Sequence, residues 1–536
     1  MFLKVIRKLN DRRFFIVLSV LVFTLMIIPF INIIYNFFQP HSPFYLAIIE
    51  KRRIHAGLIN TIELILKVGL LSAFIGFTLA YILTFYNIKH SKIWKIIMVI
   101  PLCIPVYVAA YTYSNIYFYL PWLEAITRSN FMMNGAVFIY AMFLYPYVFL
   151  ASKAYLSKHL TNYIEVSKTL GKTNRHIFFK VILPLSRPII IGSVLFTLFE
   201  TLSDFAVVEF YGVLTLSRYI NLSWFATGDF ISASKFSLYI LIIMFVLLFL
   251  ERASRKNKKY TDSDSIQRPI KKTKPQGFVR LLIYGFMSLV ATLSFVLPMI
   301  QLIVSSIINY EISSQLNLIQ ISTNTLIITI ISIAVILVVA LLLTTMTIYL
   351  KGYKKQVISS FSTIGYVVPS MVLALGLYLF FIQVDQQIYK WFSSFGLNRM
   401  LITSSITIII IGFFVKFFSI AYTNLLSAYN KTDLSLLDAS ITLGETKIST
   451  LIRVTIPMLK KSIIAVTIIL FIDMFKELTI IYSLRPFNFK TLSTEVYRYA
   501  GNEMINVAAL PSLVIIVLCS ILVIYLEGGF SNAKAK

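Results

Sequence analysis

Apolar runs of about 20 residues or more recur along the whole length of this chain. Such a run can cross a bilayer as a helix, and a backbone that faces lipid must satisfy its own hydrogen bonds. A membrane β-barrel would need short alternating segments, and these are absent from the sequence. The pattern predicts an all-α polytopic membrane protein with about twelve transmembrane helices. The predicted spans are 14–37, 57–86, 95–119, 132–152, 187–211, 234–251, 278–305, 322–350, 357–382, 403–425, 461–484 and 509–527.

Charged residues are scarce and unevenly placed. They make up 13% of the 536 residues, whereas soluble domains carry about a quarter. The formal net charge is +27, and the Lys and Arg residues gather at the N-terminus and in segments 151–188, 252–280 and 351–355. Because these segments alternate with apolar spans, the excess charge follows the positive-inside rule. It predicts that both termini lie in the cytoplasm, and it gives no reason to expect nucleic acid as a partner.

Six spans precede a polar segment and six follow it. Segment 252–277 is charged and contains proline, so it is predicted to be a cytoplasmic linker, with a basic lipid-binding segment as the alternative. The linker separates a first membrane domain, 1–251, from a second one, 278–536. Since each half has six spans, the two halves would share one orientation, as in a parallel duplication.

The strongest internal repeat lies between the fourth and fifth spans of each half, in loops 160–186 and 430–460. The first copy reads EVSKTLGKTNRHIFFKVILP and ends at Pro184, and the second reads DASITLGETKISTLIRVTIP and ends at Pro457. A weaker match places Ile104-Pro105 of the third span opposite Val368-Pro369 of the ninth. These matches support the duplication.

Each repeated loop is predicted to form two short helices joined by a sharp turn. Gly171 and Gly444 suit that turn, and Pro184 and Pro457 suit the start of the next span. A loop of this length with apolar residues on its first helix favours docking of a partner protein. A helix lying on the lipid surface is the alternative.

Two spans carry charges at a depth near the middle of the bilayer. When the copies are aligned on their loops, Glu200 falls over Asp473 and Asp204 over Glu477, and each pair shares one helix face. A charge there costs about 2.5–3.5 kcal/mol, so the side chains should face a wet cavity between the halves. The candidate translocation pathway consists of Glu200, Asp204, Glu209, Asp473, Lys476 and Glu477.

Carboxylate oxygens suit a hard, highly charged cation. Two alternatives remain: Lys476 simply neutralises Asp473, or the acids form a gate that never binds the transported solute. Lys416, in span 403–425, is expected to extend toward an interface. The five histidines are scattered, mostly in loops, so no metal site is assigned.

The repeated loop resembles the EAA loop of ABC importer permeases. That motif has an acid, two small residues, a Gly six positions after the acid and a Pro thirteen positions after the Gly. The matching positions here are Glu165, Gly171 and Pro184 in the first copy and Asp438, Ala439, Gly444 and Pro457 in the second. The chain departs from the motif where Val166 replaces a small residue and where Asp438 replaces Glu.

The acidic spans are similar to stretches of the bacterial iron(III) permeases. The first stretch has Glu200-Thr201-Leu202 followed by Asp204-Phe205 and then Tyr211-Gly212. The second has Lys476-Glu477-Leu478, followed by the letters LRPF at 484–487. The Pro that usually follows Lys-Glu-Leu in those permeases is absent here, and Thr479 stands in its place. The resemblance covers nearly the whole chain apart from the linker.

This resemblance implies a type I ABC importer-like fold and a role as the permease subunit of an iron(III) importer in a bacterial inner membrane. Two copies of a cytoplasmic ATPase would dock on the loops, and a periplasmic binding protein would deliver the solute. The partner would use ATP, while this lipid-embedded chain would be no enzyme and would bind no cofactor. Thiamine, a polyamine or an inorganic anion would fit the same class, and a proton-coupled secondary transporter is the alternative outside it.

Overall fold

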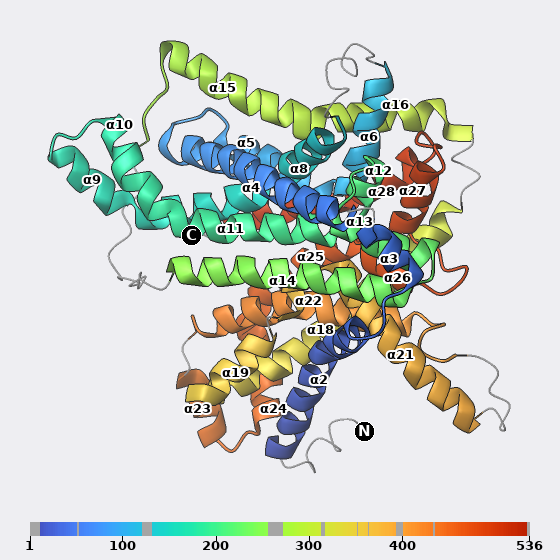
Figure 1. Cartoon of the computed structure of the whole chain (residues 1–536). Coiled ribbons are helices and arrows are strands. Elements are labelled where there is room, and N and C mark those ends of the chain that lie inside the picture. Colours follow the sequence, from blue (N-terminus) through green and yellow to red (C-terminus); the bar gives the residue numbers. More distant parts are fainter. Residues whose placement is uncertain are drawn as a thin grey trace.

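The computed structural model describes residues 11–50, 53–119, 131–255, 272–311, 317–350, 352–362, 364–392, 400–432 and 435–532. Most of the predicted linker, 256–271, lies outside the described residues, so the division into two domains there stays a prediction. In the described ranges, eleven helices are long and apolar enough to cross a membrane, or twelve if a bent pair counts as one span. The prediction of an all-α polytopic membrane protein is therefore confirmed (Figure 1).

The spans of the two halves follow the same order. The first half has α2 (Asp11–Phe37), α4 (Arg53–Phe85), a broken span of α5 (Ser91–Val99), η1 (Ile100–Cys103) and α6 (Val106–Tyr119), then α8 (Phe131–His159), α11 (Leu183–Ser203) and α14 (Phe230–Arg255). The second half has α15 (Gly277–Ala291), η4 (Thr292–Val296) and α16 (Leu297–Ile308) as one span, then α18 (Leu318–Tyr349), α19 (Gly352–Ser362), α20 (Ile364–Val367), α21 (Ser370–Phe392), α22 (Thr407–Tyr429), α25 (Ile456–Phe475) and α28 (Ala509–Asn532).

The third span of each half is broken at a proline. In the first half the two pieces on either side of the break meet at 91°, and Ile104, just before Pro105, has an extended backbone. In the second half, α20 ends at Val367 and α21 begins at Ser370, on either side of Pro369. Proline lacks an N–H and disfavours helix in the residue before it. The continuous spans predicted at 95–119 and 357–382 are therefore wrong at these two points.

The fifth and eleventh spans also end earlier than predicted. Helix α11 stops at Ser203, and α25 stops at Phe475. Each is followed by a short helix, α12 (Ala206–Phe210) or α26 (Thr479–Leu484), which the sequence analysis had included in the span. The acidic residues therefore lie where the spans end, and this position decides what they contact.

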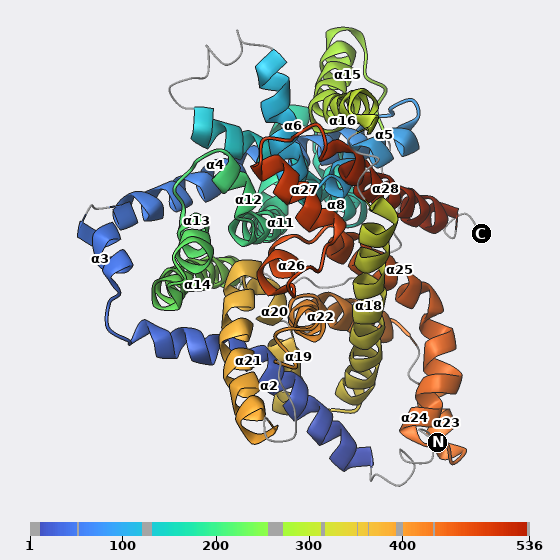
Figure 2. The ribbon, with the colours of Figure 1, turned by 90° about the vertical axis from the view of Figure 1, so that its right-hand side faces the viewer.

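The two halves interlock. Helix α2 of the first half packs against α21 of the second, and α16 of the second packs against α6 of the first. Figure 2 shows α2 crossing α21, and α15 and α16 beside α6. Both large hydrophobic clusters draw buried residues from each half, one from 64–213 and 283–523, the other from 22–244 and 328–484. The halves therefore share their cores.

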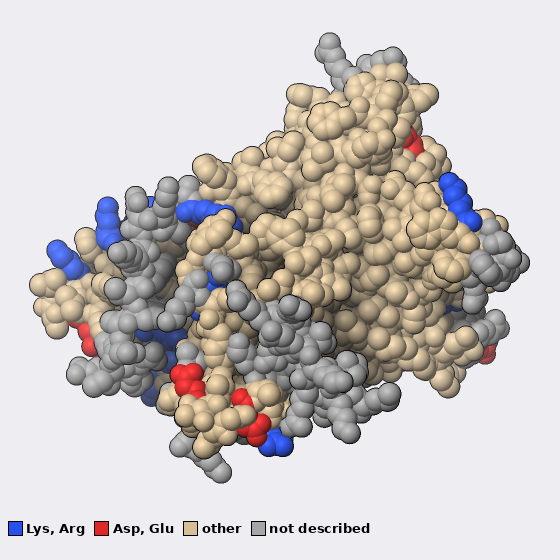
Figure 3. Space-filling model, turned by 90° about the horizontal axis from the view of Figure 1, so that it is seen from below, with Lys and Arg blue, Asp and Glu red and all other residues tan. Residues whose placement is uncertain are grey.

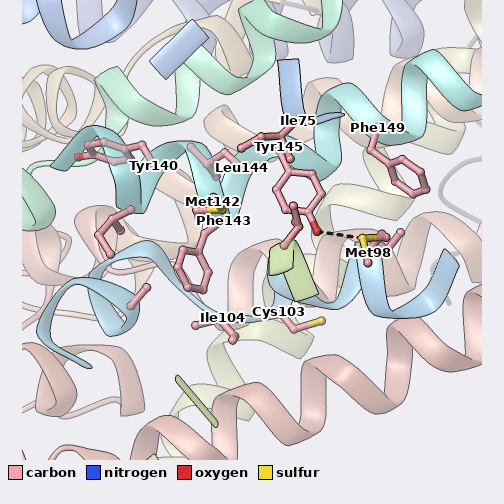
Figure 4. Packing of buried hydrophobic residues seen from close by; sticks show 14 of the residues in the cluster. Ile75, Met98, Cys103, Ile104, Tyr140, Met142, Phe143, Leu144, Tyr145 and Phe149 are labelled. Atoms are coloured by element: carbon pink, nitrogen blue, oxygen red, sulfur yellow. Dashed lines mark hydrogen bonds between the residues drawn. The ribbon is translucent and has the colours of Figure 1, made fainter. Parts of the chain in front are cut away.

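Aromatic side chains of α8 pack over the break in the third span of the first half (Figure 4). The Tyr145 hydroxyl points to Met98 Sδ at 3.7 Å, while Phe143, Cys103 and Ile104 are buried beside it. Burial of such large side chains stabilises an irregular backbone that would be costly in lipid.

Candidate functional site

The two repeated loops share the same local fold. The first forms α9 (Thr161–Thr169) and α10 (Asn174–Ile177), and the second forms α23 (Ser435–Thr442) and α24 (Lys447–Thr450). Between the helices, Gly171 has a φ of 71° and Gly444 a φ of 88°. Neither would bring an added Cβ within 4 Å of another atom, so the backbone conformation alone requires glycine.

The hydrogen bonds at the two glycines match. The Gly171 N–H donates to the Lys168 carbonyl at 3.0 Å, and the Lys172 N–H donates to the Ser167 carbonyl at 3.1 Å. The corresponding bonds recur at Gly444 and Glu445. This is the Schellman motif, which ends a helix with glycine in the left-handed region. The predicted turn between two short helices is confirmed.

Pro184 and Pro457 stand near the start of α11 and α25, as expected for residues that lack an N–H. The helical path nevertheless begins earlier than predicted, because a π turn, η2 (Phe178–Ile182) or η6 (Leu451–Thr455), joins each loop to its span. Proline removes the donor for the carbonyl one turn back, and a wider turn accommodates that loss. The second short helix of each loop, the π turn and the following span form one continuous helix, which we call a rod. The first rod runs from Asn174 to Ser203.

Both loops lie toward the same end of the molecule (Figure 1). Both also expose apolar side chains. Leu170 is 69% exposed and Leu443 is 85% exposed, at corresponding positions just before the glycines. Glu165, Asp438 and Ala439 are exposed beside them. Figure 3 shows charged side chains gathered toward this end and a broad uncharged surface elsewhere on that face. The arrangement suits a protein partner.

At the other end of each rod, two acids cap the short helices. Asp204 Oδ2 accepts the Val207 N–H at 2.9 Å, and Glu477 Oε1 accepts the Ile480 N–H at 3.1 Å. These contacts are equivalent in the two halves and satisfy N–H groups at a helix start inside the membrane. Asp204 also accepts the Tyr140 hydroxyl at 2.7 Å.

Glu200 and Asp473 contact different partners despite their matched positions. Glu200 Oε1 accepts the hydroxyl of Tyr366, from the other half, at 3.0 Å. Asp473 Oδ1 lies 3.3 Å from Lys476 Nζ, so the neutralising pair that sequence analysis left open is present. Lys476 Nζ also donates to the Leu102 carbonyl at 3.0 Å.

Lys416 is a residue whose position sequence analysis predicted wrongly. It is 2% exposed and does not extend to an interface. Its Nζ donates to the Val368 carbonyl at 3.0 Å and to Ser203 Oγ at 3.2 Å. Lys416 therefore binds a backbone carbonyl at the break beside Pro369, as Lys476 binds one at the break beside Pro105. A carbonyl unpaired in the membrane is costly, so each broken span has a lysine beside it.

Four of the six predicted pathway residues line one cavity of about 70 Å³ between the halves, namely Glu200, Asp204, Lys476 and Glu477. Asp473 is absent from its lining and lies behind Lys476. Glu209 lines a second cavity of about 670 Å³. Tyr107 lines both, so the cavities adjoin. Among the described residues, no three His, Cys, Asp or Glu side chains are placed to hold a metal ion.

Two interlocked halves, paired loops on continuous helical rods and a charged cavity between the halves define a membrane permease built from two copies of one unit. The chain belongs to the family of binding-protein-dependent transport system inner membrane components, whose pattern matches residues 72–258 and 340–531. Members of this family are transport subunits of ABC importers, which work with an ATPase and a periplasmic binding protein.

The relatives carry two different solutes. The chain is 24% identical over 504 residues to the Fe(3+)-transport system permease protein FbpB 2 of Haemophilus influenzae, covering 93% of this chain and 94% of that protein. It is 28% identical over 204 residues to the sulfate transport system permease protein CysT of Escherichia coli, covering 34% of this chain and 73% of that protein. The permease class agrees in both comparisons.

Proposed function

We propose that this chain forms the path by which iron(III), delivered by a periplasmic binding protein, enters a bacterial cytoplasm. The observation that carries this proposal is the lining of the smaller cavity, where three carboxylates, Glu200, Asp204 and Glu477, face a single lysine, Lys476. Carboxylate oxygens favour a hard cation. The whole-length similarity to an Fe(3+) permease supports the same solute.

Sulfate is the second candidate, because about a third of the chain is similar to sulfate permeases. An anion in the smaller cavity would meet three acidic side chains at close range. Like charges in a poorly hydrated site repel strongly, so this lining disfavours sulfate. Thiamine and polyamines remain as competitors in the transport test below.

We further propose that two copies of a cytoplasmic ATPase dock on the α9–α10 and α23–α24 loops. The exposed leucines on both loops support this docking. The continuous rod from Asn174 to Ser203 joins the first loop directly to the acids of the cavity. Because this helix has no break, a push on the loop would move the cavity wall.

The same proposal places both loops, and with them both termini, in the cytoplasm. Basic residues concentrate in the loop segments, as the positive-inside rule requires. ATP would then be bound and hydrolysed only by the partner. This chain would contribute no cofactor and no catalytic residue. Gly171-Lys172-Thr173 resembles the end of a phosphate-binding loop, but it follows a helix and Val166 stands at the position of the first glycine.

The test is uptake into proteoliposomes that contain the full chain and its ATPase, with the binding protein outside. Labelled iron(III) should accumulate only with ATP and both partners, and excess sulfate, thiamine or polyamine should not compete. ATP-driven uptake of sulfate without uptake of iron(III) would refute the proposed solute. Uptake driven by a proton gradient without the ATPase would refute the class of mechanism.

A further inference from the structure

The larger cavity lies toward the end of the molecule away from the loops, and both halves build it (Figure 1). Glu209 comes from α12 of the first half. Tyr497 comes from α27 (Leu492–Gly501) of the second half, and Glu503 follows that helix. This position would make the cavity the first one that a solute from outside meets.

One hydrogen bond crosses this cavity from half to half. The Tyr497 hydroxyl donates to Glu209 Oε2 at 2.7 Å, and Asn221 Nδ2 donates to the same oxygen at 2.9 Å. Within the part of the chain that the structure describes, Glu209 Oε1 accepts no hydrogen bond. A phenol and a carboxylate with one oxygen free to bind a ligand therefore meet in a space large enough for a hydrated ion.

We infer that Tyr497 and Glu209 form a receiving site for iron(III), in which Tyr497 binds as a phenolate and Glu209 as a carboxylate. The inference rests on the proposed function, since it assigns that function's solute to a site. Both ligands are anionic oxygens, which a hard trivalent cation prefers. When the bond between iron and the Tyr497 oxygen forms, the O–H bond breaks, the proton passes to water in the cavity, and the iron stays in its oxidation state.

The spacing of the two oxygens fits this role. An octahedral cation with ligand oxygens at about 2.0 Å holds neighbouring oxygens about 2.8 Å apart. The 2.7 Å between Tyr497 Oη and Glu209 Oε2 is already close to that value. The metal would replace the shared proton with little movement of either side chain, so the site needs little reorganisation.

Glu503 supplies a further acid at the same cavity. It is exposed, lines the cavity and has a φ of 61°, in a region that non-glycine residues rarely adopt. That conformation belongs to the helix-ending turn that follows α27. Two arginines also line the cavity. Hydrogen bonding to Glu495 raises the pKa of Arg498, and the Glu495 carboxylate balances the charge of the guanidinium. Arg485 donates a hydrogen bond to the Phe489 carbonyl at 3.4 Å.

The location of the ligands on opposite halves has a consequence for release. Any movement that separates α12 from α27 takes one ligand away from the ion and weakens its binding. Tyr107 lines both cavities, so an ion released here lies next to the carboxylates of the smaller one. Loss of one ligand would thus pass the ion inward.

The test is a titration of the purified full chain, in complex with its ATPase, with iron(III) supplied as the nitrilotriacetate chelate. Phenolate bound to iron(III) absorbs visible light by charge transfer, so the wild type should develop a saturable band. Tyr497→Phe should lose the band, and Glu209→Gln should bind more than about 10-fold more weakly. Gallium(III), which gives no such band, should displace iron(III) and so reduce the absorption.

Tyr111→Phe is the matched control. Tyr111 lines the same cavity, but its hydroxyl is bonded to Ser512, so the band should persist. Absence of the band in the wild type, or its survival in Tyr497→Phe, overturns the site. Equal loss in Tyr111→Phe also overturns it. If iron(III) uptake continues without the band, this inference fails and the proposed function stands, whereas sulfate uptake without iron(III) uptake refutes the function itself.

Discussion

Replacement of Gly171 by valine should weaken docking of the ATPase without disturbing the membrane helices. Gly171 has a φ of 71° and no atom within 4 Å of an added Cβ, so the substitution introduces strain but no clash. The left-handed conformation costs an L-residue roughly 1–2 kcal/mol. If docking must restore that conformation, affinity at this loop should fall about 5- to 30-fold.

Two matched variants separate backbone conformation from side-chain contact. Asparagine tolerates the left-handed region, so Gly171→Asn should weaken docking less than about threefold, although its side chain is of similar size. Gly228 has a φ of 65° and equally open surroundings, but it precedes α14 at the other end of the molecule. Gly228→Val should therefore leave docking unchanged.

The assay is titration of the partner ATPase onto each purified full-length variant, followed by ATP-driven uptake in proteoliposomes. Gly444→Val should reproduce the loss at the second loop, and the double variant should abolish uptake. If Gly171→Asn is as weak as Gly171→Val, side-chain contact rather than φ explains the glycine. If Gly228→Val weakens docking equally, the loop is not the docking element.

Three further predictions concern the buried charges and the docking surface. Lys416→Met removes the donor to the Val368 carbonyl and should lower the free energy of unfolding in detergent by about 2–4 kcal/mol. Replacement of the exposed Lys168 by Met should change it by less than about 0.5 kcal/mol, and equal losses would contradict the role of Lys416. The double variant Glu200→Gln with Asp473→Asn removes one carboxylate that lines the smaller cavity and one that pairs with Lys476, and it should reduce iron(III) uptake at least about 10-fold while ATPase binding persists. Normal uptake would exclude both acids from the pathway. Leu443→Asp places a charge on a side chain that is 85% exposed and should weaken ATPase binding about 10-fold, whereas unchanged binding would show that this surface is not the docked one.

The features that sequence analysis predicted correctly depend on short stretches of chain. A span needs only its own apolar residues, and the turn at Gly171 needs only the conformation that glycine allows. Repetition in two halves strengthened both predictions, because Gly444 repeats the turn. The pairing of Lys476 with Asp473, three residues apart, was likewise visible as one of the open alternatives.

The features that it missed depend on contacts between distant segments. Pro105 and Pro369 were seen inside apolar runs, but composition alone does not show whether a helix continues past a proline. Lys416 looked like a residue near an interface because its partners, Val368 and Ser203, come from other spans. The six pathway candidates were grouped by sequence, whereas in the structure four line the smaller cavity, Glu209 lines the larger one and Asp473 lines neither.

The polar contacts between the halves show why such a protein would need a motor. Lys476 reaches the Leu102 carbonyl, Tyr366 reaches Glu200, and Tyr497 reaches Glu209, each across the boundary between the halves. A hydrogen bond to a charged group contributes about 1.5–3 kcal/mol, so separating the halves costs several kcal/mol before any solute moves. Thermal motion alone would rarely supply that energy at all three contacts together. Because one continuous helix, Asn174–Ser203, joins the first loop to Glu200, we expect force applied at that loop to act first on the hydrogen bond between Tyr366 and Glu200.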